Sequence, residues 1–223
     1  MLFGLTNLFP SPSMLKAADD DETTSLTEEG ETLSIAQLPP MPRPRRAEQL
    51  GESTLGVFVV TVLVGLLVGV THGIAVGPRT QNNNWLPLLF IYAEAALAYI
   101  CLLGLLCADP GTIKRTRATC YPIPPDVAAR LKSGEPLTDL AGNISRDGRS
   151  YCVRCLVWRD KSADSRFEGS HSIHHCSTCQ RCVVDFDHHC GVFGRCIAGS
   201  GFSGNMKYFK GILFCFAAGI TTC

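Results

Sequence analysis

The 223-residue sequence has no excess of charge of either sign. Twenty lysines and arginines balance twenty aspartates and glutamates, so the chain as a whole has no electrostatic attraction for nucleic acid. The first residues also lack the basic start, the sustained apolar stretch and the small-residue cleavage site of a signal peptide. We therefore do not expect a secreted protein, and we do not expect its twelve cysteines to form a disulfide framework.

The sequence does contain a local concentration of side chains that bind metals. Seven of the twelve cysteines and five of the six histidines fall between residues 152 and 196. Such clustering favours metal binding in a reducing compartment over disulfide bonds.

Two long apolar runs predict membrane helices. Residues 55–76 carry no formal charge, and about 20 helical residues cross a bilayer core of about 30 Å. Residues 85–107 form the second run, with Trp85 at its polar edge, where amphipathic aromatic residues prefer to lie. Residues 207–223 are apolar again and are predicted to begin a third transmembrane helix, which the end of the chain cuts off.

The segments between the apolar runs are predicted to face the cytosol. Residues 1–53 are rich in Pro, Ser, Thr and charge, which is typical of a disordered tail. Residues 108–150 are predicted to be a turn-rich linker with one short helix in PPDVAARLKSG. The basic residues near the runs are Arg43, Arg45 and Arg46 before the first, Arg79 between them, and Lys114, Arg115 and Arg117 after the second. This bias puts both the tail and the segment after the second run on the cytosolic side.

Three Cys-x2-Cys spacings predict two zinc sites. Zinc prefers four tetrahedral Cys or His ligands, so eight candidate ligands make two closed sites. One set can be Cys152, Cys155, His175 and Cys182, and the other Cys176, Cys179, His189 and Cys196. Residues 151–205 are the predicted zinc domain. Because residues 151–201 are short of apolar periodicity, we expect zinc to supply the folding free energy that a core does not.

Counting these ligands leaves one cysteine of the segment, Cys190, without a metal. The thiolate is the reactive form of cysteine, and a neighbouring imidazole promotes it. A carboxylate behind that imidazole can fix its tautomer. We therefore predict Cys190 as a nucleophile, His188 as its base and Asp187 as the orienting carboxylate. An extended backbone would turn His188 and His189 to opposite sides.

These residues resemble the cysteine-rich domain of the DHHC protein S-acyltransferases, or palmitoyltransferases. The resemblance rests on HHCSTCQRC followed by DHHC, on Asp109-Pro110-Gly111, which looks like the family's DPG motif, and on Asn205 and Phe209. It runs from about residue 55 to the end of the chain, and the ligand sets above agree with the family arrangement. Residues 191–195 depart from the family's Pro-Trp and two asparagines, and Phe193 becomes a candidate contact for an acyl chain. The family's fourth span and TTxE motif are missing, which suggests a C-terminally truncated chain.

The resemblance implies a multi-pass α-helical membrane protein with a small, irregular, zinc-stabilised cysteine-rich domain in its cytosolic loop. It implies that Cys190 takes a long acyl group such as palmitoyl from acyl-CoA and passes it to cysteine thiols of substrate proteins. The implied cofactors are two structural Zn²⁺ ions, and the implied partners are acyl-CoA, substrate proteins and the bilayer, with no nucleic acid. The expected location is an endomembrane, Golgi or endoplasmic reticulum, or the plasma membrane. The alternative is a catalytically impaired, membrane-tethered zinc module that binds partner proteins. Such a module would have no need of a thiol that binds no metal.

Overall fold

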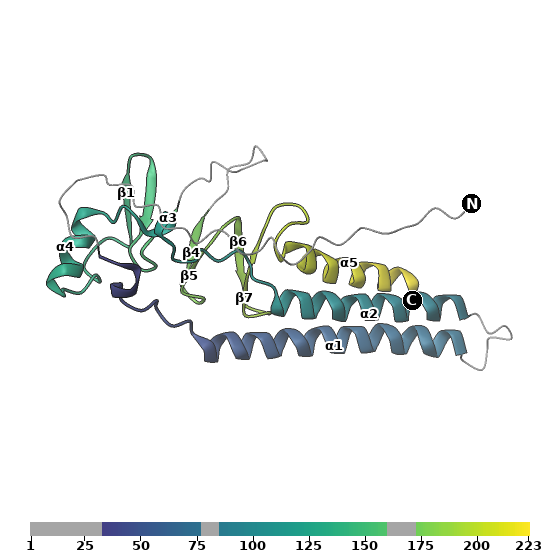
Figure 1. The fold of residues 1–223 in the computed structure, drawn as a ribbon. Coiled ribbons are helices and arrows are strands. Elements are labelled where there is room, and N and C mark those ends of the chain that lie inside the picture. Colours follow the sequence, from purple (N-terminus) through teal and green to yellow (C-terminus); the bar gives the residue numbers. More distant parts are fainter. Residues whose placement is uncertain (1–32, 77–84, 160–172) are drawn as a thin grey trace, which may run out of the picture. The chain divides into compact units, whose positions relative to one another are not determined.

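The computed structural model describes residues 33–76, 85–159 and 173–223 (Figure 1). Most of the predicted N-terminal tail, residues 1–32, and the turn at 77–84 lie outside the described residues. A short 3-10 helix, Ile35–Gln37, precedes the first long helix.

Three helices correspond to the apolar runs: α1 (Arg46–Val76), α2 (Trp85–Cys107) and α5 (Met206–Thr222). Helix α2 has the bounds of the second predicted run. Helix α1 begins ahead of the predicted Leu55, so the expected tail of residues 1–53 is wrong for residues 46–53, which are helical. The physical reason is that this first part of α1 makes side-chain hydrogen bonds to the cysteine-rich region.

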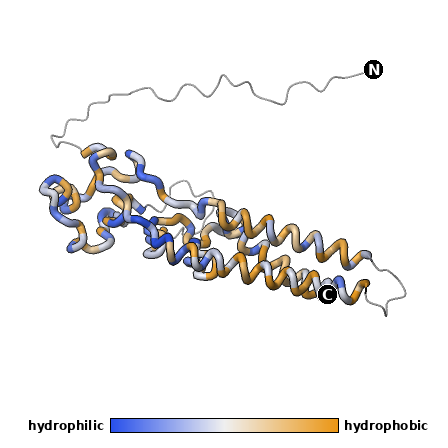
Figure 2. The backbone as a smooth tube through the Cα atoms, turned by 90° about the horizontal axis from the view of Figure 1, so that it is seen from below, coloured by the Kyte–Doolittle hydropathy of each residue, from blue (hydrophilic) through white to orange (hydrophobic). Residues whose placement is uncertain are grey.

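Two of these helices are long and apolar enough to cross a membrane, α1 and α2. Apolar residues predominate along both helices, as the mostly orange tubes in Figure 2 show. Phe58, Leu66 and Leu103, for example, are each more than 60% exposed. A helix that is apolar all round suits a lipid environment. Helix α5, with 17 residues, is shorter than these two spans.

The three helices pack on one another through a shared apolar cluster. Val60 of α1, Leu105 of α2 and Ile212 of α5 are each at most 2% exposed within it. A Cβ at Gly211 of α5 would lie 2.5 Å from the Cys101 sulfur, so α5 approaches α2 closely only because that position has no side chain.

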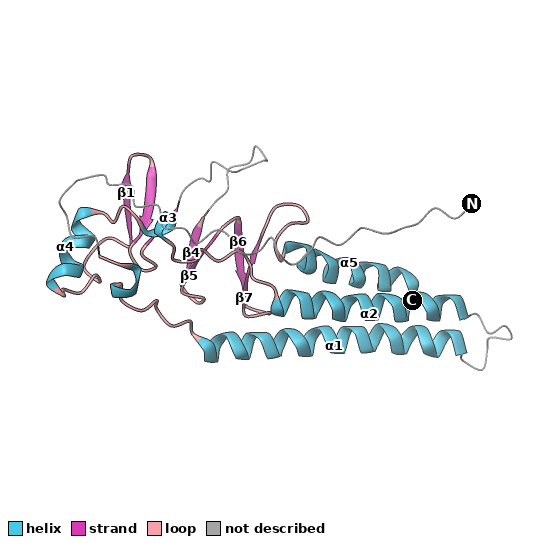
Figure 3. Cartoon of the chain, viewed as in Figure 1, coloured by secondary structure: helices cyan, strands magenta, loops and turns pink. Residues whose placement is uncertain are grey.

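The cysteine-rich region is built from small antiparallel strands (Figure 3). The strands are β1 (Asn143–Arg146), β2 (Arg149–Cys152), β3 (Val157–Arg159), β4 (His174–Cys176), β5 (Arg181–Val183), β6 (Phe186–Cys190) and β7 (Arg195–Ala198). They pair as the sheet β1-β2-β3 and the hairpins β4-β5 and β6-β7. Strands of three to five residues bury little apolar surface by themselves, so they need stabilisation from other parts of the chain or from bound metal.

Residues 108–150 do more than link the helices to this region. They form α3 (Arg117–Cys120) and α4 (Pro125–Ser133), the latter at the predicted short helix. Val127 of α4 is fully buried in one cluster with Tyr151 and Trp158. Strand β1 also pairs with β2, so the predicted boundary between linker and zinc domain at residue 151 cuts through a sheet that begins at Asn143.

Candidate active site and metal centres

Three hairpins of the cysteine-rich region share one backbone turn. In each, a backbone N–H donates to the carbonyl of a cysteine four residues earlier, which is an α-turn. The donor and acceptor residues, with their N···O distances, are Leu156 and Cys152 at 2.7 Å, Gln180 and Cys176 at 2.8 Å, and Gly194 and Cys190 at 2.9 Å. All three donor residues have a left-handed φ, of 55°, 53° and 63°.

The first two turns bring the predicted ligands together. Cys152, Cys155, His175 and Cys182 form one group, and Cys176, Cys179, His189 and Cys196 form the other. Within each group all the ligand atoms lie within 4.8 Å of one another. These are the two sets expected from the spacing, and each is a Cys3His cluster. We call them cluster one and cluster two.

In cluster one, four buried side chains meet around the His175 ring. The His175 Nδ1 lies 3.6 Å from the Cys152 sulfur, 3.2 Å from that of Cys155 and 3.9 Å from that of Cys182. Hydrogen bonds from Cys155 and Cys182 lower the pKa of the Cys152 thiol. Hydrogen bonds with Cys152 and Cys155 raise the pKa of the Cys182 thiol, so the thiolate, which is the form that binds metal, is favoured at Cys152.

In cluster two, strand β6 supplies the histidine and β7 the last cysteine. The His189 Nδ1 lies 3.5 Å from the Cys176 sulfur, 3.4 Å from that of Cys179 and 3.9 Å from that of Cys196. Hydrogen bonds from Cys179 and Cys196 lower the pKa of the Cys176 thiol.

The residues of both clusters fit a zinc ion. Tetrahedral zinc, with bonds of about 2.3 Å to sulfur and about 2.0 Å to nitrogen, requires sulfur–nitrogen separations of roughly 3.5 Å. The six separations of 3.2–3.9 Å bracket that value. The clusters are therefore consistent with two zinc sites.

Two residues of α1, within the predicted tail of residues 1–53, contact cluster two. Gln49 donates from Nε2 to the Cys179 sulfur at 3.2 Å, and Glu52 Oε2 lies 3.1 Å from His189 Nε2. Nothing in the spacing of cysteines and histidines signals these partners, because they lie more than a hundred residues away in the chain.

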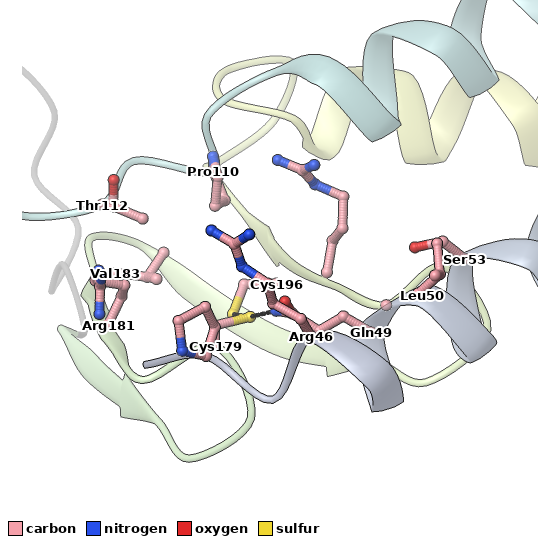
Figure 4. A pocket seen from close by; sticks show the side chains of 13 residues that line it. Arg46, Gln49, Leu50, Ser53, Pro110, Thr112, Cys179, Arg181, Val183 and Cys196 are labelled. Atoms are coloured by element: carbon pink, nitrogen blue, oxygen red, sulfur yellow. Dashed lines mark hydrogen bonds between the residues drawn. The ribbon is translucent and has the colours of Figure 1, made fainter. Parts of the chain in front are cut away.

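A cavity of about 510 Å³ lies beside cluster two, where α1 begins. Figure 4 shows its wall, with Arg46 and Gln49 of α1 facing Cys179 and Cys196. Cluster two is thus less enclosed than cluster one: its Cys179 and His189 are only partly buried.

The predicted catalytic residues lie on strand β6, beside cluster two. Asp187 Oδ2 is 2.9 Å from His188 Nδ1. His188 and Cys190 are two residues apart in the strand and so point to the same face, while His189 faces the other way into cluster two. Among the described residues, Cys190 belongs to neither cluster. Its side chain is 8% exposed, in the apolar cluster that the three helices share.

Aromatic residues connect this strand to the helices. Phe209 of α5 makes edge-on ring contacts with His188 at 5.6 Å and with Phe193 at 6.4 Å. Phe193 is 6% exposed and packs against α1, since a Cβ at Gly56 would lie 2.5 Å from its ring. The predicted contact residue Phe193 is therefore part of the junction between the hairpin and the helices.

Arg195 and Asn205 also hold the β6-β7 hairpin in place. Arg195, in the stretch that departs from the family pattern, donates to the carbonyls of Leu106 and Ala108 at the end of α2. Such carbonyls lack helical partners. Asn205 is fully buried, accepts the N–H of Ala198 at 2.8 Å and donates to the carbonyl of Cys196 at 2.7 Å.

The Asp109-Pro110-Gly111 turn connects α2 to the hairpins. Asp109 Oδ1 accepts the backbone N–H groups of Gly111 and Thr112 at 3.0 and 2.9 Å. Partial burial raises the pKa of Asp109, but these hydrogen bonds outweigh it and the net pKa is lowered. The Gly111 carbonyl accepts from Val184, so the turn fixes the chain that leaves α2 against β5.

Comparison with known proteins places this site in a family. The family model described as DHHC palmitoyltransferase matches residues 145–223. This segment contains all eight residues of the two clusters, strand β6 and helix α5. No solved structure matches the chain.

Several palmitoyltransferases are similar to part of this chain in sequence. Palmitoyltransferase Hip14 of Drosophila melanogaster is 33% identical over 121 residues, or 54% of this chain. Palmitoyltransferase ZDHHC17 of Danio rerio is 33% identical over 107 residues, or 48% of the chain. Palmitoyltransferase ERF2 of Kluyveromyces lactis is 28% identical over 123 residues, or 52% of the chain. The matched segments cover 15%, 13% and 30% of these relatives' own lengths.

Proposed function

Since the chain belongs to the DHHC palmitoyltransferase family, a family of acyltransferases, we propose that it transfers a long acyl group, such as palmitoyl, from acyl-CoA to cysteine thiols of substrate proteins. Cys190 is the nucleophile, His188 its base and Asp187 the carboxylate that orients His188. The observation that carries the proposal is that Cys190 lies outside both clusters, on the strand that holds the Asp187–His188 pair.

The reaction has two balanced steps. In the first, His188 Nε2 takes the Cys190 proton, and the sulfur attacks the thioester carbonyl of acyl-CoA. The bond to the CoA sulfur breaks, and CoA leaves as a thiol with the proton from His188. In the second, His188 takes the proton of a substrate cysteine, whose sulfur attacks the Cys190 thioester carbonyl. The bond to the Cys190 sulfur breaks, and Cys190 leaves as a thiol with the proton from His188. The Asp187 contact supports His188 in both steps, because it holds the Nδ1 proton and leaves Nε2 free to accept.

Clusters one and two each hold a structural Zn²⁺ in this proposal. The metal adds folding free energy to short strands that bury little apolar surface by themselves, and a closed site of four protein ligands leaves it no open position. The ligands are the four residues of each cluster, with both histidines using Nδ1.

The active site lies at the cytosolic face of an endomembrane or the plasma membrane in this proposal. Cys190 shares its apolar cluster with Val60, Leu105 and Met206, one from each helix. An acyl chain that leads from Cys190 along the helices would remain in apolar surroundings, and each buried methylene stabilises it by about 0.8 kcal/mol. Phe193 is the side chain best situated to contact the chain.

The test is acyl labelling of the full chain in lipid nanodiscs. With palmitoyl-CoA that carries a labelled acyl group, the wild type is expected to gain a hydroxylamine-sensitive label. Cys190→Ser should gain none and still hold two zinc ions. Cys107→Ser, at an exposed cysteine of α2, is the matched control and should keep the label. A wild type that holds two zinc ions but takes no label would instead support a membrane-tethered zinc module that binds partner proteins.

A further inference from the structure

The first turns of α1 present one polar face to the β6-β7 hairpin and to the β4-β5 turn. Gln49, Glu52 and Ser53 are spaced three and four residues apart, so they lie on the same side of the helix. Gln49 donates to the Cys179 sulfur at 3.2 Å and Ser53 donates to the Phe193 carbonyl at 2.8 Å. Between them, Glu52 reaches His189. The end of a membrane helix is thus in direct contact with cluster two.

The contact between Glu52 and His189 has the geometry of an outer carboxylate at a metal site. The ring turns Nδ1 to the three sulfurs and Nε2 to Glu52 Oε2 at 3.1 Å. Both side chains are mostly buried, at 16% exposure for His189 and 22% for Glu52. Histidines that bind a metal through one nitrogen usually donate the other N–H to a carboxylate, a backbone carbonyl or a water, which fixes the tautomer and the ring orientation.

Cluster one provides an internal comparison. Its histidine, His175, has the same orientation toward its sulfurs, but its buried Nε2 has no hydrogen-bond partner in the described structure. The carboxylate is therefore not a general requirement of the Cys3His geometry in this chain. It is specific to the cluster whose histidine is adjacent to Cys190.

We propose that Glu52 is a positioning residue of cluster two, which holds His189 as the Nε2–H tautomer and so ties α1 to the metal and to strand β6. This inference rests on the proposed zinc occupancy of cluster two. Because His189 and Cys190 are neighbours in β6, the same contact holds the nucleophile at the junction with the helices.

Zinc release from the full chain in nanodiscs tests this inference. Under challenge with a chromogenic chelator, one of the two zinc ions should leave about 10- to 100-fold faster from Glu52→Ala than from the wild type. Glu52→Gln should show a smaller change, because its amide oxygen can still accept the Nε2 proton. With Co²⁺ in place of zinc, Glu52→Ala should also alter the absorption bands of one site only.

Two controls separate positioning from helix docking. Glu48→Ala removes an exposed carboxylate one turn earlier, whose ion pair is with Arg45, and should release zinc as the wild type does. Ser53→Ala removes a docking hydrogen bond to the same hairpin and should also leave zinc release unchanged. A slow, unchanged release from cluster one in every variant reports that the domain is folded.

The inference is overturned if both zinc ions leave Glu52→Ala at the wild-type rate, or if Ser53→Ala accelerates release as much as Glu52→Ala. Zinc release does not require acyl transfer, so the two proposals fail separately. A wild type with two zinc ions and no acyl label refutes the proposed function and leaves this measurement intact.

Discussion

The hairpins β2-β3, β4-β5 and β6-β7 have the same α-turn, which begins at a cysteine. They differ in the residue three positions after that cysteine. In the first two, a second cysteine, Cys155 or Cys179, follows the first by three residues and joins it in a cluster. In β6-β7, Phe193 occupies that position and Cys190 is left without a sulfur partner in the turn. One turn geometry therefore carries a pair of cluster cysteines in two hairpins and a single cysteine in the third.

The surroundings of the hairpins differ in the same way. Cys152 and Cys155 are buried in a core that α4 and the β1-β2-β3 sheet provide. Cys190 and Phe193 belong instead to the apolar cluster of α1, α2 and α5. Phe193, at the position of the second cysteine in the other two hairpins, thus packs the third hairpin onto the helices, as the proposed acyl transfer requires.

Loss of a cysteine from a Cys-x2-Cys hairpin should have the largest effect on zinc content and on stability. Cys152→Ser removes a ligand of cluster one, and structural zinc contributes on the order of 10 kcal/mol to such domains. We expect the zinc content to fall below two per chain and the cysteine-rich region to lose its resistance to proteolysis. Elemental analysis and limited proteolysis measure both. Retention of two zinc ions and of protease resistance would contradict a structural role for cluster one.

Changing the β6-β7 hairpin should affect chemistry without unfolding. Asp187→Asn removes the carboxylate that contacts His188, and His188→Ala removes the proposed base. Each should slow acyl labelling about 10²- to 10⁴-fold, the range typical of general acid–base catalysis, with two zinc ions retained. The rate of label incorporation gives the measurement. Labelling at the wild-type rate in His188→Ala would mean that another group takes the Cys190 proton.

The smallest expected effect concerns the connection of this hairpin to α5. Asn205→Ala leaves the Ala198 N–H and the Cys196 carbonyl buried without partners, at about 1–3 kcal/mol for each unsatisfied group. The melting temperature should fall, while Asn143→Ala, on the exposed edge of β1, should change it little. Equal melting temperatures for Asn205→Ala and the wild type would show that water replaces the side chain.

The sequence predicted much of the site because ligand chemistry is local. The Cys-x2-Cys spacing determines a tight turn, and four ligands per zinc divide the eight candidates into two sets that the structure brings together. The family resemblance is confirmed by the match over residues 145–223. The spacing could not predict the early start of α1 or the sheet that begins at Asn143, because both depend on partners that are distant in the chain.

The sequence by itself determined which side chains can hold metal and which cysteine of residues 152–196 is left without one. It also determined which two runs are apolar enough to enter a membrane. All three follow from residue type and short spacing. Only the tertiary structure decided what surrounds each cluster. It brings Glu52 to His189, Arg195 to the end of α2 and Phe193 to Gly56, across separations of about ninety residues or more. Contacts at that distance depend on how the helices and hairpins pack against one another, which no local pattern in the chain encodes.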